Sequence, residues 1–461
     1  TLTEQSNSTF SLTVTGTGAL TLTGANTYTG GTDVLAGTLY VNGDQSGATG
    51  LTSVAGGATL GGSGIIGGDV TLADGASLNP GTSPGTLTIN GNLSLSGGSI
   101  LNFEFGEAGV AGGALNDLVN VGGDLVLDGT LNVTTSLGGT FGAGVYRVFN
   151  YSGTLTDNGL ELGTMPGSDV VLQTSVANQV NLVNTAGASL SFWDGASGAN
   201  NGTIDGGAGL WQSGAGNSNW TDANGTFNGA YDAGTFAIFQ GTGGTVTVDT
   251  SLGAVTASGL QFVADGYVID GDTLTLAGGS QAAIRVGDGT AGGAGVTATI
   301  AADITGAVEL IKTDMGTLVL SGDNSYTGGT RLDVGTLVLG SNNALGTGVL
   351  STAGDTTLGL ADGVSIANAI ALGGDTRIDL AGTSTLSGVI SGTGALIRTG
   401  NGTLILTGAN TYTGGTVLSG FTTITNSSAL GTGTITSAGG LLNIGADGIV
   451  LANTIDLQNV L

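Results

Sequence analysis

The sequence lacks cysteine and histidine altogether, and each absence excludes a class of chemistry. Without histidine the Ser-His-Asp and Cys-His catalytic machineries cannot form, and the usual zinc sites are excluded as well. The stretch GTSPG at 81–85 matches the nucleophile-elbow pattern, but no histidine exists to serve it, so we interpret it as a turn. A lack of disulfides is normal in the cytosol, and it also fits secreted bacterial proteins that cross a membrane unfolded.

Proline and charged residues are scarce. Only three prolines accompany 93 glycines, so the chain is not collagen, which needs both residues in a fixed period. Charged residues make up 8% and apolar residues 39%, a balance that argues against disorder and suffices for a narrow core. Six basic residues against 33 acidic ones leave a net charge of −27, which repels phosphate backbones and excludes nucleic acid as a partner.

Long apolar runs are also missing. No run approaches the roughly eighteen residues that a membrane-spanning helix requires. The first ten residues, TLTEQSNSTF, carry neither an initiator Met nor a basic and apolar signal region. We therefore expect a mature or trimmed piece of a longer protein, with any membrane anchor outside this chain.

Short alternating strands separated by turn residues fill most of the sequence. Examples are TLTINGNLSLSGG at 86–98, GGDLVLDGTLNVT at 122–134 and GTLVLGSNNALGTG at 335–348. Thr, Val and Ile favour a pleated surface, while Gly and Asn-Gly pairs provide corners with positive backbone angles. The pattern predicts an all-β protein.

One stretch occurs three times. LTGANTYTGGT at 22–32 returns unchanged at 406–416, and LSGDNSYTGGT stands at 320–330. Each copy begins with a leucine pair around a variable residue, and the two-residue period of a strand predicts that the leucines face inward. The pairs are Leu20 and Leu22, Leu318 and Leu320, and Leu404 and Leu406, around Thr21, Val319 and Ile405.

The pattern resumes about nineteen residues later, for example as GTLYVNG from Gly37, a spacing that suits one coil of a parallel β-helix. We expect about twenty coils, stacked at roughly 4.8 Å. The predicted corners, where Asn side chains of neighbouring coils are expected to bond one another, are Asn26, Tyr28, Gly30, Gly31, Asn324, Tyr326, Gly328, Gly329, Asn410, Tyr412, Gly414 and Gly415. Tandem β-sandwiches and a propeller are the alternatives, but sandwiches have longer strands with fewer glycines, and propeller blades carry strong aromatic signatures.

The consensus GTLxLxGxNxYTGGTxxxxGTLxxG resembles the passenger-associated repeat of bacterial autotransporters, also called the autotransporter-associated β-strand repeat. Stretches at 60–95, 116–133 and 146–163 are similar to the same family, so the resemblance covers most of the chain. It implies a right-handed parallel β-helix, carried as a surface-exposed passenger and exported through the outer membrane of a Gram-negative cell by a C-terminal β-barrel. Membrane contact is then expected only through a barrel that is not among these 461 residues.

The middle of the chain has a different composition. Residues 188–276 hold all three tryptophans and ten of the 22 aromatic residues (3 Trp, 8 Tyr and 11 Phe). We expect a β-helix with the first repeat copy at 1–187, an aromatic-rich β insertion or joint at 188–276, and a β-helix with two repeat copies at 277–461. In one interpretation Trp193, Trp211 and Trp220 form a glycan-binding face; in the other, which we favour, the aromatic side chains bury one another in a small core.

Acidic residues suggest two further kinds of site. Asp265, Asp270 and Asp272 stand on turns that suit calcium, although the tandem nine-residue calcium-binding pattern is absent and solvated turn aspartates are the alternative. Glycoside hydrolysis needs two carboxylates, for which Glu104 with Glu107 or Asp270 with Asp272 are candidates. Because acids gather at the turns of any Gly-Asp-rich solenoid, we predict no catalytic residues and no cofactor other than calcium.

Together with these observations, the resemblance implies a non-enzymatic passenger at the bacterial cell surface or released from it, acting as a stalk, an adhesin or a matrix component. Natural sheet edges are usually protected by lysine, and with almost none here we expect self-association into bundles or fibres. A glycan or protein of a host or matrix is the other expected partner. The alternatives are a glycan-binding module acting through the tryptophan-rich segment, and the stalk of an enzyme whose catalytic domain lies outside this chain.

Overall fold

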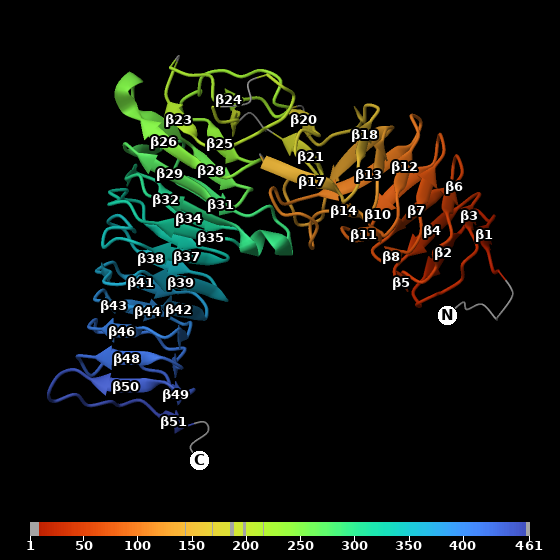
Figure 1. Ribbon diagram of the computed structural model, residues 1–461. Coiled ribbons are helices and arrows are strands. Elements are labelled where there is room, and N and C mark those ends of the chain that lie inside the picture. Colours follow the sequence, from red (N-terminus) through yellow and green to blue (C-terminus); the bar gives the residue numbers. More distant parts are fainter. Residues whose placement is uncertain are drawn as a thin grey trace. The chain divides into compact units, whose positions relative to one another are not determined.

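The computed structural model describes residues 9–142, 144–167, 169–184, 189–196, 200–214 and 216–457. Nearly all regular structure in these residues is β-strand, and the helices are two short 3₁₀ turns, η1 (Thr250–Leu252) and η2 (Ala291–Gly295). None of the helices in the described part of the chain has the length and apolarity needed to cross a bilayer. The chain divides into two compact units, Thr1–Ala188 and Ser189–Leu461 (Figure 1).

In the described residues of the first unit, successive coils add strands to three seven-stranded sheets. The first sheet, in spatial order, contains β1 (Leu12–Val14), β3 (Thr32–Val34), β6 (Thr52–Val54), β9 (Val70–Leu72), β12 (Leu93–Leu95), β15 (Leu125–Leu127) and β18 (Leu155–Asp157). The second contains β2 (Ala19–Leu22), β4 (Thr38–Val41), β7 (Thr59–Gly62), β10 (Ser77–Pro80), β13 (Ile100–Phe105), β16 (Thr130–Thr135) and β19 (Glu161–Leu162). The third contains β5 (Asp44–Gln45), β8 (Ile65–Ile66), β11 (Thr86–Ile89), β14 (Leu118–Val121), β17 (Gly144–Tyr151), β21 (Gln179–Asn184) and β20 (Val170–Gln173).

The described residues of the second unit form four sheets. The ten-stranded sheet contains β24 (Trp220–Thr221), β22 (Leu190–Trp193), β25 (Phe236–Phe239), β28 (Gly259–Phe262), β31 (Gln281–Val286), β34 (Glu309–Thr313), β36 (Thr330–Leu332), β38 (Leu350–Thr352), β41 (Ile370–Leu372) and β44 (Ile390–Gly392). The 12-stranded sheet contains β23 (Gly209–Gln212), β26 (Thr245–Asp249), β29 (Tyr267–Gly271), β32 (Thr297–Ile300), β35 (Thr317–Leu320), β37 (Thr336–Leu339), β39 (Thr356–Leu360), β42 (Thr376–Leu380), β45 (Leu396–Thr399), β47 (Thr416–Leu418), β49 (Ile435–Ser437) and β51 (Ile455–Leu457). Two smaller sheets contain β27 (Val255–Ala257), β30 (Leu274–Leu276) and β33 (Ile304–Thr305), and β40 (Ser365–Ile366), β43 (Thr383–Leu386), β46 (Thr403–Leu406), β48 (Phe421–Ile424) and β50 (Leu441–Ile444).

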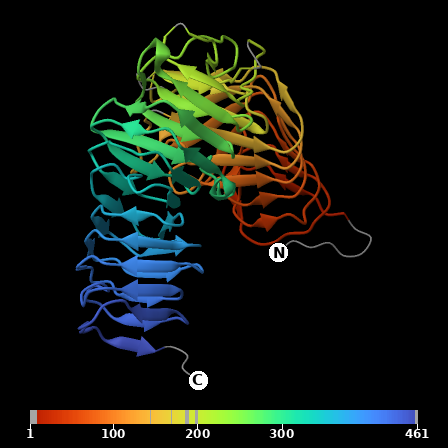
Figure 2. The ribbon, with the colours of Figure 1, turned by 60° about the vertical axis from the view of Figure 1, so that its left-hand side comes forward.

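Strands of successive coils pair in parallel, and Figure 2 shows them stacked one above the next in the second unit. This arrangement confirms the predicted parallel β-solenoid of about twenty coils, because a sandwich or a propeller would pair its strands mainly antiparallel. Antiparallel pairing is found where β21 lies between β17 and β20, and where β24 lies beside β22. At these places the chain turns back on a neighbouring strand instead of continuing the coil.

Leucines lie over leucines in the core of the solenoid. In the pairing of β35 with β37, Leu318 is opposite Leu337 and Leu320 is opposite Leu339. The predicted inward leucines are buried at Leu22, Leu318, Leu320, Leu404 and Leu406, and the residues between them are half-buried or exposed. The prediction is wrong for Leu20, which is 37% exposed. It lies in the first paired coil of the described chain, where fewer neighbours cover it.

The aromatic-rich segment belongs to the second unit. Its strands β26 and β28 pair in parallel with β29 and β31 of the following coils, so the segment forms coils of the solenoid itself. Each unit has its own continuous apolar core, and the core of the second unit runs from Trp193 to Ile435. A single column therefore carries both the aromatic coils and the last two repeat copies.

Candidate ligand-binding site

The repeated corner is built around an asparagine that bridges three coils. Asn324 is buried, accepts a hydrogen bond from the Ile304 amide at 2.7 Å and donates one to the Ala344 carbonyl oxygen at 2.6 Å. Asn410 makes the same pair of bonds, at 2.7 and 2.6 Å, to backbone groups twenty residues before it and nineteen after it. The prediction that these corner asparagines bond one another is therefore wrong. They bond the main chain of the coils on either side, and Asn26 donates to the Gln45 side chain at 2.6 Å.

The corner tyrosines point into the core. Each hydroxyl lies 2.6–2.7 Å from the hydroxyl of the threonine four residues later, in the pairs Tyr28 with Thr32, Tyr326 with Thr330 and Tyr412 with Thr416. Burial raises the pKa of Tyr412 to about 12 and also raises that of Tyr326. All three tyrosines are thus structural side chains bonded within the coil, and the raised pKa values keep Tyr326 and Tyr412 protonated.

The glycine pair of the corner meets two separate requirements. A Cβ on Gly328 would lie 2.3 Å from backbone atoms of Val308, so the first glycine allows the preceding coil to approach closely. The second, Gly329, has a φ of 88°, a conformation that side chains rarely adopt. Gly414 and Gly415 show the same division. The corner asparagines and tyrosines are buried and the glycines meet backbone requirements, so these residues serve the fold.

The three tryptophans pack against one another in the core. Trp193 and Trp211 are 0% exposed and Trp220 is 2% exposed, and each of the first two has its ring centroid 5.1 Å from that of Trp220. The ring centroid of Tyr231 lies 4.6 Å from that of Trp220, with the two rings tilted by 45°. Because a sugar ring stacks on an exposed aromatic face, these tryptophans do not form the glycan-binding face of the first hypothesis. Their mutual burial matches the favoured interpretation of a small aromatic core.

The three aspartates considered for calcium do not lie together. Asp265 accepts a hydrogen bond from the Thr297 amide at 2.7 Å, and Asp272 accepts one from the Thr250 amide at 2.9 Å. These two lie beyond opposite ends of β29, a strand of five residues that spans about 13 Å. Asp270 lies on β29 between them. Within the described residues, no three acidic side chains are placed to hold a metal ion.

The backbone amide of Glu104 bonds a carboxylate that the sequence did not single out. Glu104 is half-buried on β13, whereas Glu107 lies exposed in the turn that follows. The Glu104 amide instead donates to Asp117 Oδ2 at 2.7 Å, and the Gly85 amide donates to Asp117 Oδ1 at 2.8 Å. Asp117 is 1% exposed, and this burial raises its pKa to about 7. One oxygen of Asp117 thus bonds the loop 81–85 and the other bonds β13, so the side chain clamps the two together.

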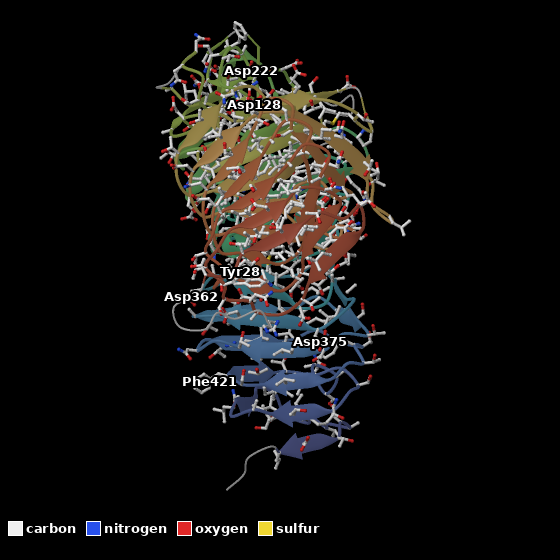
Figure 3. All side chains as sticks on the ribbon, turned by 90° about the vertical axis from the view of Figure 1, so that its right-hand side faces the viewer. Tyr28, Asp128, Asp222, Asp362, Asp375 and Phe421 are labelled. Atoms are coloured by element: carbon white, nitrogen blue, oxygen red, sulfur yellow. The ribbon has the colours of Figure 1, made fainter. Side chains whose placement is uncertain are left out.

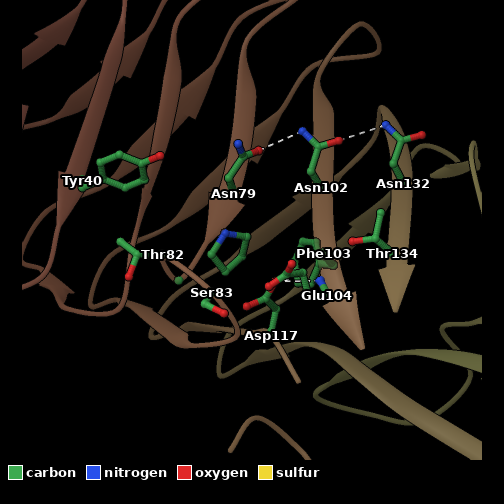
Figure 4. A pocket seen from close by; sticks show the side chains of 12 residues that line it. Tyr40, Asn79, Thr82, Ser83, Asn102, Phe103, Glu104, Asp117, Asn132 and Thr134 are labelled. Atoms are coloured by element: carbon green, nitrogen blue, oxygen red, sulfur yellow. Dashed lines mark hydrogen bonds between the residues drawn. The ribbon is translucent and has the colours of Figure 1, made fainter. Parts of the chain in front are cut away.

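A polar hollow of about 330 Å³ opens beside this clamp on the outer face of the first unit (Figure 4). One side is a row of amides that crosses neighbouring strands: Asn102 Nδ2 donates to Asn79 Oδ1 at 2.8 Å, and Asn132 Nδ2 donates to Asn102 Oδ1 at 3.1 Å. Its lining residues are Tyr40, Asn79, Pro80, Gly81, Thr82, Ser83, Asn102, Phe103, Glu104, Asp117, Asn132 and Thr134. We call this hollow the asparagine groove.

Tyr40 continues the amide row on strand β4. The pairing register places Tyr40 opposite Gly61 and Gly61 opposite Asn79, so the ring and the first amide are two strands apart. A Cβ on Gly61 would lie 3.2 Å from two carbons of the Tyr40 ring. The glycine therefore leaves space for the ring beside the row. A half-buried ring, a line of amides and a carboxylate in one hollow can hydrogen-bond and stack with a polar ligand.

Comparison with known proteins agrees with this solenoid. The model of the family described as Passenger-associated-transport-repeat matches residues 12–41, 310–339 and 396–420, which contain the three corners. The curated relative "Adhesin BmaC autotransporter" of Brucella suis biovar 1 (strain 1330) is 52% identical over 374 residues. The chain belongs to the autotransporter passengers.

The match covers 76% of this passenger chain but only 10% of the relative, so the chain spans about a tenth of the length of that adhesin. As part of a passenger, the chain is surface-exposed. The matched repeats encode the corners, whereas the asparagine groove lies outside them except for Tyr40. A sequence signal for the groove does exist: Asn79, Asn102 and Asn132 each occupy an outward position between apolar neighbours on three successive strands of one sheet.

Proposed function

We propose that this passenger segment is a non-enzymatic part of a surface adhesin, in which the solenoid presents binding faces to a surface outside the cell. The 52% identity to a protein named as an adhesin, sustained over 374 residues, carries this proposal. A glycan or protein of a host cell or of its matrix is the partner that such a segment would contact.

The distribution of polar side chains between the core and the surface supports a scaffold whose recognition positions lie on its outer face. Corner asparagines and tyrosines are buried and bonded within the solenoid, while alternate strand residues such as Thr21 and Asn102 face outward. The non-enzymatic role is supported by the sequence, which has no histidine and no cysteine, so the common nucleophile–base pairs cannot form.

The adhesive function is testable with the chain itself. Fluorescent beads coated with the folded chain are applied under flow to epithelial cell layers and to plates coated with extracellular matrix. Beads coated with the same chain after heat unfolding are the control for non-specific adsorption. We expect the folded chain to retain beads on at least one of these surfaces. Retention no greater than that of the control on every surface would overturn the proposal.

We also propose that copies of the chain associate with one another. Exposed positions on the outer face include apolar side chains such as Phe421, which lies at the outside of the second unit (Figure 3). The chain has six basic residues in total, so few lysines or arginines are present to keep sheets apart. Sedimentation velocity at increasing micromolar concentrations is expected to show species larger than a monomer. A single monomeric species at all concentrations would exclude this association.

A further inference from the structure

We propose that the asparagine groove binds an uncharged oligosaccharide, whose hydroxyl groups bond the amide row while one sugar ring packs on Tyr40. This deepens the proposed adhesive function by naming a class of ligand. The inference stands on the geometry of the first unit, and no part of it requires the buried tryptophans.

The amide row matches the hydrogen bonding of sugar hydroxyls. An asparagine side chain has two N–H donors and an oxygen with two lone pairs. In the row, Asn102 uses one N–H on Asn79 and one lone pair on Asn132. One donor and one acceptor therefore remain on this exposed side chain, and a sugar hydroxyl both donates and accepts.

The spacing of the row is set by the sheet. Asn79, Asn102 and Asn132 lie on the adjacent strands β10, β13 and β16, which are about 4.8 Å apart. Two strand steps thus span about 10 Å, a length that holds two linked pyranose rings. The bonds between the amides fix their orientation before any ligand arrives. Less conformational entropy is then lost on binding.

Tyr40 supplies the apolar contact that carbohydrate recognition requires. Figure 4 shows it in line with the amides, at the Asn79 end of the groove. Its ring lies beside Gly61, where a larger residue would displace it. The C–H face of a pyranose ring can pack on such an aromatic side chain while the ring's hydroxyls reach the amides.

Charge in the groove selects against anionic ligands. The Glu104 carboxylate lines the hollow, Asp117 beside it carries only part of a charge at neutral pH because its pKa is about 7, and the lining contains no lysine or arginine. The chain as a whole carries a net charge of −27. A sulfated or otherwise acidic polysaccharide would be repelled, whereas a neutral one would not.

Isothermal titration calorimetry tests the proposal with hexasaccharides of β-1,4-glucose, α-1,4-glucose, β-1,4-N-acetylglucosamine and α-1,6-mannose, and with a heparin hexasaccharide. We expect at least one neutral member to bind and heparin not to bind. Tyr40→Ala is expected to weaken binding by about three- to tenfold, the effect of one aromatic contact. Asn102→Ala, which breaks the row at its centre, is expected to weaken it by a similar factor, whereas Tyr40→Phe retains it.

Matched control variants lie in the second unit. Phe421→Ala removes an aromatic side chain that is 49% exposed, and Asn443→Ala removes an exposed amide that contacts Thr423. Both are expected to bind as the unchanged chain does. In the unchanged chain, the neutral ligand is also expected to slow amide exchange in peptides from β10 and β13. This measurement needs no variant and decides the proposal if a groove variant fails to fold.

Three results would overturn the groove as a glycan site: no binding by any neutral hexasaccharide, preference for heparin, or binding unaffected by both Tyr40→Ala and Asn102→Ala. These results leave the adhesive function standing if coated beads still adhere. Conversely, neutral hexasaccharide binding that depends on Tyr40, together with no adhesion of beads to any surface, would support the site and exclude the proposed adhesive function.

Discussion

At the residue scale, side-chain amides and carboxylates replace main-chain bonds where the coil turns. Along one edge of the first unit, Asp69 accepts the Asn92 amide at 2.8 Å, Asn92 accepts the Asp124 amide at 2.7 Å, and Asp124 accepts the Thr154 amide at 2.7 Å. Each corner thus bonds the next one along the solenoid. The excess of acidic residues over basic ones arises partly from this use, since a carboxylate with bonded amides needs no cation.

Asn410 provides a direct test of the corner bridge. Asn410→Ala leaves the Ile390 amide and the Ala429 carbonyl oxygen buried without their partner, at a cost of about 2–4 kcal/mol of unfolding free energy. Urea unfolding followed by circular dichroism measures this loss, and amide exchange at Ile390 locates it. The control Asn443→Ala removes an exposed amide and is expected to leave stability nearly unchanged. Equal midpoints for the two variants would contradict the bridging role.

The raised pKa of Asp117 predicts that the stability of the first unit around this residue depends on pH. Its pKa in the folded protein, about 7, lies above the ordinary value of 3.8, so between these values the folded state keeps a proton that the unfolded state has lost. The stabilisation is complete below about pH 4 and declines as the pH rises to about 7. From pH 5 to 7.5 the free energy of local opening is expected to fall by about 2–3 kcal/mol.

Hydrogen exchange of peptides covering 81–121, corrected for intrinsic rates, measures that change. Asp117→Asn removes the titrating group, and the dependence in these peptides is expected to flatten. Asp128→Asn, a substitution in the same unit away from the groove, is the control that should keep the dependence. A steep fall that persists in Asp117→Asn would show that another group is responsible.

At the element scale, one coil is too small to be stable alone and depends on the coils stacked on it. Parallel register places like residues over one another, as with Leu337 over Leu318 and Leu358 over Leu337. The aromatic coils follow the same rule with larger side chains: Phe239 stacks on Phe262 of the next coil, with ring centroids 4.9 Å apart. In this segment aromatic side chains fill the column where the strands stack in parallel, whereas β24 departs from the coil by pairing antiparallel with β22.

Trp220 and Phe227 form a matched pair for testing this packing. Trp220 is buried against two other tryptophans, so Trp220→Ala is expected to cost about 3–5 kcal/mol. Phe227, in the same segment, is 78% exposed, and Phe227→Ala is expected to change stability by less than about 0.5 kcal/mol. Urea unfolding monitored by the remaining tryptophan fluorescence measures both. A large loss in Phe227→Ala would show that this side chain packs against another part of the protein.

At the scale of the whole molecule, the residues that the structure describes form two apolar columns instead of one. The core of the first unit runs from Val14 to Leu182, and that of the second begins at Trp193. Stability in a solenoid is approximately a sum of coil and nearest-neighbour terms, so separate columns need not unfold together. All three tryptophans lie in the second column, which gives each unit a distinguishable signal.

We therefore expect unfolding in two separable transitions. Tryptophan fluorescence follows the second unit alone, whereas far-ultraviolet circular dichroism follows the strands of both. Urea curves from the two probes are expected to differ, with an additional transition in the dichroism that fluorescence does not report. Superimposable curves at every urea concentration would indicate that the two columns unfold as one cooperative unit.

The sequence by itself determined the coil. The two-residue period of its leucine pairs, the spacing near twenty and the repeated Asn-Gly-Gly corners predicted parallel strands around an apolar column, because these features act within one coil and its neighbours. The prediction failed at Leu20, whose exposure depends on how many coils cover it and cannot be known from an alternating pattern. The repeat does not reveal the partners of its asparagines: Asn324 and Asn410 bond backbone groups of other coils, and Asn26 bonds the Gln45 side chain.

Only the tertiary structure determined which side chains lie side by side on one surface and which are buried. Asn79, Asn102 and Asn132 are separated by 23 and 30 residues, and only the strand register aligns them into one row. Asp117 reaches Gly85 across 32 residues, so no local motif could reveal its clamp. The burial of the three tryptophans was equally undetermined, since an aromatic residue suits a core and a binding face alike. Coils differ in length, and their stacking decides which side chains meet.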